Sequence, residues 1–139
     1  MAKLNLFNGR EAERISESDA VAVIGLGRFG QSLALELMAN GVDVLGVDGD
    51  QQVVQGLDGR LTYVVMADAT REDVLRQLSI PEFNRVVVAI GQDIGASILA
   101  VSLLLRFGVP EIWAEAVSEA HGTVLEQLGV HHVIFPEKD

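Results

Sequence analysis

The stretch AVAVIGLGRFG at residues 20–30 decides the fold of this chain. It opens with five small or branched apolar residues, a pattern typical of a buried parallel strand. These residues run directly into Gly25, Gly27 and Gly30, and apolar residues then recur at helical spacing as far as Gly41. The stretch therefore predicts a strand, a glycine-rich turn and a helix in immediate succession.

The same alternation of strand and helix continues along the chain. We expect strands at residues 20–24, 42–47, 61–66, 85–90, 112–117 and 132–135, and helices at 31–40, 51–57, 71–78, 93–107 and 119–128. Such alternation implies right-handed crossovers and a parallel sheet covered on both faces. The predicted fold is a doubly wound α/β (Rossmann) domain at residues 20–139, with strand order 3-2-1-4-5-6 and an N-terminal arm at residues 1–19.

Composition restricts the possible functions. The chain has 139 residues, which fits one domain, and 49% of them are hydrophobic. A formal net charge of −10 argues against a nucleic-acid partner, and the absence of cysteine excludes disulfides and thiolate chemistry. The longest apolar run, at residues 94–107, is shorter than the roughly twenty residues that cross a bilayer. With no secretory signal visible, we expect a cytoplasmic protein.

The three glycines have distinct roles in binding a nucleotide's phosphates. Gly25 permits the tight turn, Gly27 lets the phosphates approach the backbone, and Gly30 allows the helix to pack closely on the strand. The start of the helix adds unpaired N–H groups and a partial positive charge. The alternative interpretation is a glycine turn that serves packing alone.

Asp48 closes the second predicted strand, about twenty positions after the glycines. Its carboxylate suits both hydroxyls of a ribose and would repel a 2′-phosphate, so NAD(H), ATP or ADP should be admitted and NADP rejected. Asp48 is alternatively a solvated loop carboxylate or a helix N-cap. Arg28 lies at the helix start, where a cation is unfavourable unless it meets an anion such as phosphate. It is alternatively an exposed arginine paired with a surface carboxylate.

Two further loops leave strands at the same edge of the sheet. They span residues 67–70 and 89–92, and ligands of open α/β sheets bind outside the carboxyl ends of the strands. We therefore expect both loops near the adenine. Asp68 or Thr70 is alternatively the N-cap of the following helix.

The sequence contains no recognisable catalytic arrangement, and we expect the protein not to be an enzyme. A dehydrogenase needs a further substrate domain with an acid–base residue. The histidines come late in the chain, and the adjacent His131 and His132 begin a strand and point to opposite faces. They are therefore expected to be ordinary strand-edge residues.

Six strings carry a resemblance to a known family: VAVIGLGRFGQSLALEL at 21–37, VLGVD at 44–48, MADAT at 66–70, VVVAIG at 86–91, IWAEAV at 112–117 and VLEQLGVHHVIFPEKD at 124–139. They resemble the RCK, or KTN, domains of the regulatory subunits of Ktr and Trk potassium uptake systems, especially those of the KtrA type. The resemblance covers the chain from about residue 20 to its last residue.

The resemblance implies a nucleotide sensor. Members bind ATP, ADP or NAD(H), and form homodimers that assemble into an octameric cytosolic ring. The ring lies at the inner face of the membrane and gates a potassium-translocating subunit of the KtrB or TrkH type. The family's crossover helix and C-terminal lobe would follow residue 139 and are not in this sequence.

Family positions also assign roles to individual residues. Arg28 would reach the terminal phosphate, and Glu137 matches a carboxylate linked to a divalent cation, Mg²⁺ or Ca²⁺, near the phosphates. Glu137 is alternatively an ordinary exposed acid near the end of the chain. Together with the positions expected to contact the ribose, the adenine and the rest of the pocket, the full set of expected nucleotide-binding residues is Gly25, Gly27, Arg28, Phe29, Gly30, Asp48, Gly49, Asp50, Asp68, Ala69, Thr70, Ile90, Gly91, Glu115 and His121.

The chain departs from one branch of the family. Calcium-gated potassium channels with RCK rings carry an acid-x-acid pair after the fifth strand. Here the first acid is Glu115, and Val117 stands two positions later in place of the second acid, which weakens such a calcium site. Three functions remain open at this point: a ligand-sensing regulatory subunit, the NAD-binding half of a dehydrogenase, and a module that binds nucleotide only to dimerise.

Overall fold

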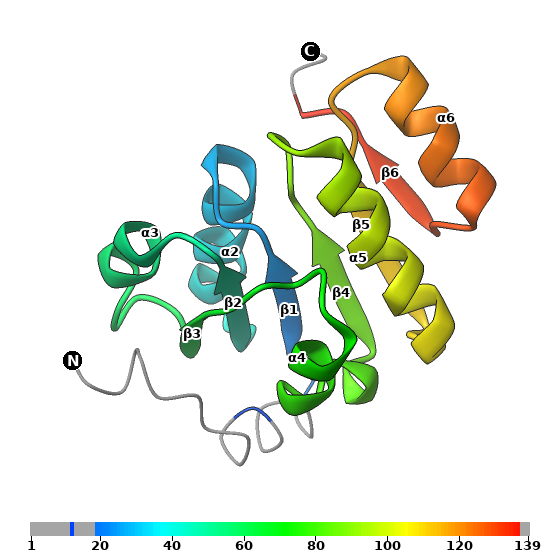
Figure 1. Cartoon of the computed structure of the whole chain (residues 1–139). Coiled ribbons are helices and arrows are strands. Elements are labelled where there is room, and N and C mark those ends of the chain that lie inside the picture. Colours follow the sequence, from blue (N-terminus) through cyan, green and yellow to red (C-terminus); the bar gives the residue numbers. More distant parts are fainter. Residues whose placement is uncertain (1–11, 13–18, 137–139) are drawn as a thin grey trace.

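The computed structural model describes residue 12 and residues 19–136 (Figure 1). In chain order the elements after residue 19 are β1 (Val21–Ile24), α2 (Arg28–Ala39), β2 (Val44–Asp48), α3 (Gln51–Gly56), β3 (Tyr63–Met66), α4 (Glu72–Gln77), the 3-10 turn η2 (Ile80–Glu82), β4 (Arg85–Val88), α5 (Ile94–Phe107), β5 (Glu111–Glu115), α6 (Glu119–Leu128) and β6 (His132–Ile134). Most of the predicted N-terminal arm lies outside the described residues.

The sheet confirms the predicted topology. Its strands pair in the order β3-β2-β1-β4-β5-β6, and every pair is parallel. β1 is central, with all four residues buried, as expected for a strand covered on both faces. Successive β1 residues enter opposite cores, because side chains of a strand alternate between the two faces.

Helices cover both faces of the sheet. One core lies beneath α2 and α3 and includes Ala34, Val54 and the β1 residue Val23. The opposite core lies beneath α4, α5 and α6 and includes Ile24 and Leu104. Figure 1 shows α5 in front of the sheet and α2 behind it. Burial on both faces fixes the strand edges, and with them the loops that follow each strand.

Several element boundaries differ from the predicted ones. The first helix begins at Arg28 instead of residue 31, so the last residues of the glycine motif form its first turn. β4 ends at Val88 and β5 ends at Glu115, each two residues earlier than expected. The apolar pattern continues into the loops because Ala89 and Ala116 remain buried after strand pairing stops. The turn η2 after α4 was not predicted.

The predicted roles of Gly25 in the tight turn and of Gly30 in close packing are confirmed. Gly25 has a φ of 100°, a left-handed conformation that favours glycine. A Cβ atom on Gly30 would overlap the backbone carbonyl of Gly25 and would also lie 3.0 Å from the Cβ atom of Ala89. Only glycine at position 30 lets α2 approach β1 this closely.

We expect Gly30→Ala to destabilise the domain. The added methyl group meets rigid backbone, and overpacking of this kind costs about 1–3 kcal/mol. Gly56→Ala is the matched control, because a Cβ atom there meets nothing within 4 Å and alanine favours a helix. Urea denaturation should give a lower free energy of unfolding for the first variant and an equal or higher one for the second. Equal stability of the two variants would contradict the close contact.

Candidate functional site

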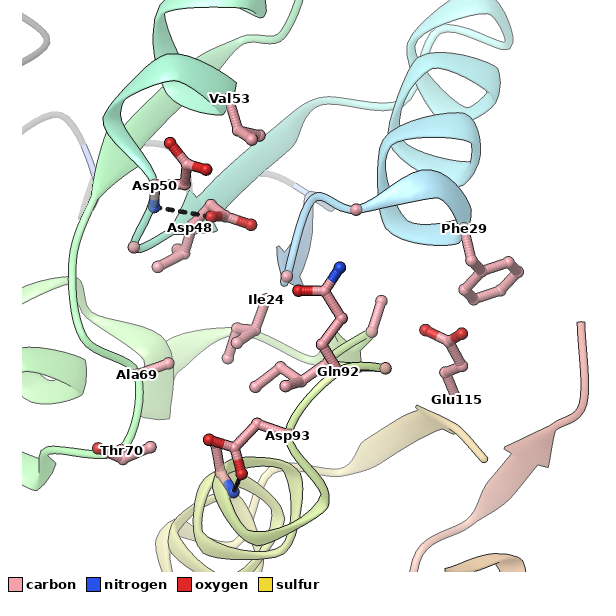
Figure 2. Close-up of a pocket in the computed structure, with 18 of the residues that line it drawn as sticks. Ile24, Phe29, Asp48, Asp50, Val53, Ala69, Thr70, Gln92, Asp93 and Glu115 are labelled. Atoms are coloured by element: carbon pink, nitrogen blue, oxygen red, sulfur yellow. Dashed lines mark hydrogen bonds between the residues drawn. The ribbon is translucent and has the colours of Figure 1, made fainter. Parts of the chain in front are cut away.

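The carboxyl ends of β1 to β5 open into one crevice of about 930 Å³ (Figure 2). Its volume lies within the range of small-molecule sites. The crevice lies at the point where the strand order reverses, between β1 and β4, which is the usual ligand position in a doubly wound sheet. Its lining residues come from the loops after all five strands and from the first turns of the helices that follow.

The first turn of α2 presents backbone donors at this crevice. Gly27 is the N-cap of α2, and no side chain caps the helix there. The first N–H group bonded within the helix is that of Gln31, which donates to the Gly27 carbonyl at 2.8 Å. The N–H groups of Arg28, Phe29 and Gly30 therefore have no acceptor in the helix. Since a Cβ at Gly27 would meet nothing within 4 Å, the backbone here is open to a ligand.

Asp48 joins the end of β2 to the glycine-rich loop. One carboxylate oxygen accepts a hydrogen bond from the Leu26 N–H at 2.7 Å, and the other accepts from the Asp50 N–H at 2.8 Å. Asp48 is therefore neither a solvated loop carboxylate nor a helix N-cap. The N-cap of α3 is Asp50, which accepts from the Gln52 N–H. A carboxylate accepts about four hydrogen bonds in total, so Asp48 retains capacity for two hydroxyls.

Asp68 is fixed in a tight turn after β3. Its Oδ1 atom accepts hydrogen bonds from the Thr70 hydroxyl at 2.6 Å and from the Thr70 N–H at 2.9 Å. These bonds lower the pKa of the Asp68 carboxyl below its ordinary value, so it is charged at neutral pH. The alternative that Asp68 or Thr70 caps the next helix is wrong, because the N-cap of α4 is Arg71 and no side chain caps that helix.

The crevice is strongly acidic. Among the described residues, its lining carries one cationic side chain, that of Arg28, against five carboxylates: Asp48, Asp50, Asp68, Asp93 and Glu115. Arg28 forms no ion pair with any residue of the described part of the chain, so the alternative of a pairing with a surface carboxylate is not found there. An anionic ligand would meet favourable charge chiefly at the first turn of α2.

Most of the predicted binding residues come together in the crevice. The lining includes Gly25, Gly27, Arg28, Phe29, Asp48, Gly49, Asp50, Asp68, Ala69, Thr70, Ile90, Gly91 and Glu115. Gly30 and His121 are not in the lining, and Glu137 lies outside the described residues. The described residues contain no group of three or more His, Cys, Asp or Glu side chains that could hold a metal ion.

His121 lies behind the crevice, contrary to the pocket position expected for it. The ring is 2% exposed, its Nδ1 atom accepts from the Val117 N–H at 3.2 Å, and its Nε2 atom lies 3.2 Å from the Ser97 hydroxyl. An accepting Nδ1 requires the proton of the neutral ring to be on Nε2, which donates to Ser97. Burial lowers the pKa of His121. The ring thus ties α6 to α5 and to Val117, which lines the crevice.

The two later histidines lie at the start of β6, away from the crevice. The Nδ1 atom of His131 accepts a hydrogen bond from the Ile112 N–H at 3.0 Å. His132 stacks on Trp113 with ring centroids 4.0 Å apart, and its Nε2 atom lies 3.3 Å from a Glu111 carboxylate oxygen. Both rings contribute to the pairing of β5 with β6.

The sequence analysis missed several crevice residues. Those from strand ends and from the first turns of helices are Ile24, Val47, Val53, Met66, Asp93 and Ala96. The predicted boundaries of the strands and of α5 could have identified these residues as part of the crevice, because residues at those boundaries all lie at the same edge of the sheet. No pattern in the sequence shows which of their side chains turn toward the ligand.

Residues 21–136 match the family model described as the TrkA-N domain, and the chain belongs to this family. Over 118 residues it is 45% identical to the Ktr system potassium uptake protein A of Bacillus subtilis (strain 168), an alignment that covers 85% of this chain and 53% of that protein. The chain thus spans about half the length of this relative. In residues 12 and 19–136, no helix has the length and apolar character that crossing a membrane requires.

Solved structures share the fold. The TrkA-N domain of the inner membrane protein ybaL from Escherichia coli superposes with a TM-score of 0.76 at 19% identity, covering 86% of this chain and 89% of that one. The GsuK channel bound to NAD gives a TM-score of 0.72 at 16% identity, covering 83% of this chain and 21% of the channel chain. A structure of GsuK bound to ADP gives a TM-score of 0.71, also at 16% identity, covering 83% of this chain and 30% of that chain.

We expect Asp48→Asn to destabilise the fold before any ligand is considered. An amide has only one acceptor oxygen, so one of the two N–H groups now bonded to Asp48 would face an NH₂ group. Loss of one such bond costs about 1–2 kcal/mol. Asp58→Asn, at an exposed position outside the crevice, should change the free energy of unfolding by less than about 0.5 kcal/mol. Equal values for both variants in urea denaturation would contradict the structural role of Asp48.

Acidification should weaken the domain through His121. Because burial favours the neutral ring, the pKa of His121 is lower in the folded chain than in the unfolded one. The unfolded state therefore takes up the proton first as the pH falls. The stability that the neutral, buried His121 ring contributes is fully present above a pH of about 6.5 and is lost as the pH falls below that value. His121→Gln should show a shallower fall in unfolding free energy between pH 7 and 5 than the wild type does, and equally steep falls would contradict this role of His121.

Proposed function

We propose that this chain is the nucleotide-sensing domain of a cytoplasmic regulatory subunit in a potassium uptake system. The observation that carries the proposal is the open first turn of α2, where unpaired N–H groups face an acidic crevice beside the Asp48 carboxylate. Such a turn suits a diphosphate, and the carboxylate at the end of β2 suits a ribose. The 45% identity to a Ktr system protein supports the link to potassium uptake.

The ligand in this proposal is an adenine nucleotide: ATP or ADP, with NAD(H) as a further candidate. GsuK structures bound to NAD and to ADP support these classes, since the two proteins share the fold. Asp48 and Asp50 lie together where a ribose 2′-phosphate would have to fit, and their charges disfavour NADP. The similarity to Ktr system proteins supports a regulatory role over an enzymatic one.

Sensing requires that two ligands favour different shapes of the assembly. ATP and ADP share the base, the sugar and the first two phosphates, so they differ only at the terminal phosphate. Arg28 is the cationic side chain of the described crevice and is the candidate for that contact. Differential binding to two shapes of a ring would then shift the ring and its gate, as linkage requires.

The partners in this proposal are further copies of the chain and a membrane protein. Homodimers of the full-length subunit form an octameric ring, which binds peripherally at the inner face of the membrane to a potassium-translocating subunit of the KtrB or TrkH type. A divalent cation, Mg²⁺ or Ca²⁺, would accompany the phosphates with Glu137 as its ligand. The excess of carboxylates in the crevice supports a cation there, because a triphosphate adds further negative charge.

The proposal predicts selective stabilisation by nucleotides. ATP, ADP and NADH should raise the melting temperature of the chain, and NADPH should not; a ligand at 100 times its Kd adds about 2.7 kcal/mol. Arg28→Ala should reduce the affinity for ATP more than that for ADP in calorimetry. Arg60→Ala, at an exposed position outside the crevice, should alter neither affinity. If no nucleotide at millimolar concentration stabilises the wild type, the proposed sensor function is wrong.

A further inference from the structure

Gln92 lies in the loop between β4 and α5, where it lines the crevice. Figure 2 shows its side chain extending from this loop into the crevice, with the amide end between Asp48 on one side and Glu115 on the other. The side chain is exposed, and its amide forms no hydrogen bond with any described residue. An amide held over the crevice in this way is available to a ligand.

Side-chain hydrogen-bond donors are scarce in the described lining of this crevice. The carboxylates at its edge already accept from the nearby backbone N–H groups of Leu26, Asp50, Gln52, Thr70 and Ala96. A phosphate needs donors, and those N–H groups are no longer available to it. The Thr70 hydroxyl donates to Asp68, so the side-chain donors that remain in the described lining are the guanidinium of Arg28 and the amide of Gln92, beside the backbone N–H groups of the first turn of α2.

The loop that carries Gln92 lies against the glycine-rich loop. β1 and β4 are neighbours in the sheet, with Ile24 paired to Val88. The two loops touch where these strands end, since a Cβ atom at Gly25 would overlap the Ala89 carbonyl oxygen. Gln92 follows three residues later in the same loop, and it lines the same crevice as Gly27 and Arg28 at the start of α2.

We propose that Gln92 is a phosphate-binding residue, whose amide Nε2 donates a hydrogen bond to the diphosphate of a bound nucleotide. The first turn of α2 binds one side of the diphosphate, and Gln92 binds an oxygen on the side that faces the β4–α5 loop. The inference rests on the proposed nucleotide site and adds a side chain to a set of donors that otherwise consists of backbone and Arg28. Its ligand class is a nucleoside diphosphate or a larger nucleotide containing a diphosphate.

Two substitutions at one position test this assignment by calorimetry with ADP. Gln92→Ala removes the donor and should weaken ADP binding by about tenfold, the usual effect of one hydrogen bond to a charged group. Gln92→Glu keeps the length of the side chain but replaces the donor with a negative charge. This variant should bind ADP more weakly still than Gln92→Ala, because its carboxylate repels the phosphates.

Gln55 supplies the matched control. It is exposed on α3 outside the crevice, and both Gln55→Ala and Gln55→Glu should bind ADP as the wild type does. The inference is overturned if Gln92→Ala binds ADP with wild-type affinity. It is also overturned if Gln92→Glu binds ADP at least as well as Gln92→Ala, because the amide would then accept from a ribose hydroxyl. If the wild type binds ADP, either of these results overturns the role of Gln92 and leaves the proposed function intact. A wild type that binds no ADP refutes both the role of Gln92 and the proposed function.

Discussion

The hydrogen bond from the Leu26 N–H to the Asp48 carboxylate is the interaction on which the site depends. β1 and β2 pair with Ile24 opposite Val47, so the glycine-rich loop that follows β1 begins level with Asp48, the last residue of β2. The carboxylate then holds the glycine-rich loop against the end of β2. Since Gly30 lets α2 pack directly on that loop, the donors of the helix and the acceptor of the strand keep one fixed spacing.

This arrangement also explains the unusual electrostatics of the crevice. Five carboxylates line it, and hydrogen bonds from backbone N–H groups hold several of them in place, so these acids also stabilise the loops. The carboxylates repel a negatively charged ligand group from most of the crevice, and the first turn of α2 is where such a group meets favourable charge. A ligand that carries hydroxyls at one end and a diphosphate at the other fits this division, and a nucleotide is such a ligand.

The hydrogen bonds of His121 connect the crevice with the outer helices. The ring joins Val117, which lines the crevice, to Ser97 on α5, and its own backbone lies in α6. Both ring nitrogens are engaged, so a displacement of the loop after β5 requires α5 and α6 to adjust with it.

The sequence by itself determined the fold class, the strand order and most of the crevice residues, because strand patterning and the glycine motif are local and a parallel sheet brings its strand ends to one edge. It could not determine that Asp48 binds Leu26, that Asp68 turns back to Thr70, or that His121 lies behind the crevice. Those outcomes depend on contacts between segments distant in the chain, or on the choice among several acceptors within one loop. Tertiary packing also decided the extra turn at the start of α2 and the early ends of β4 and β5. Burial continues after strand pairing stops, and apolar periodicity does not distinguish a buried loop residue from a paired strand residue.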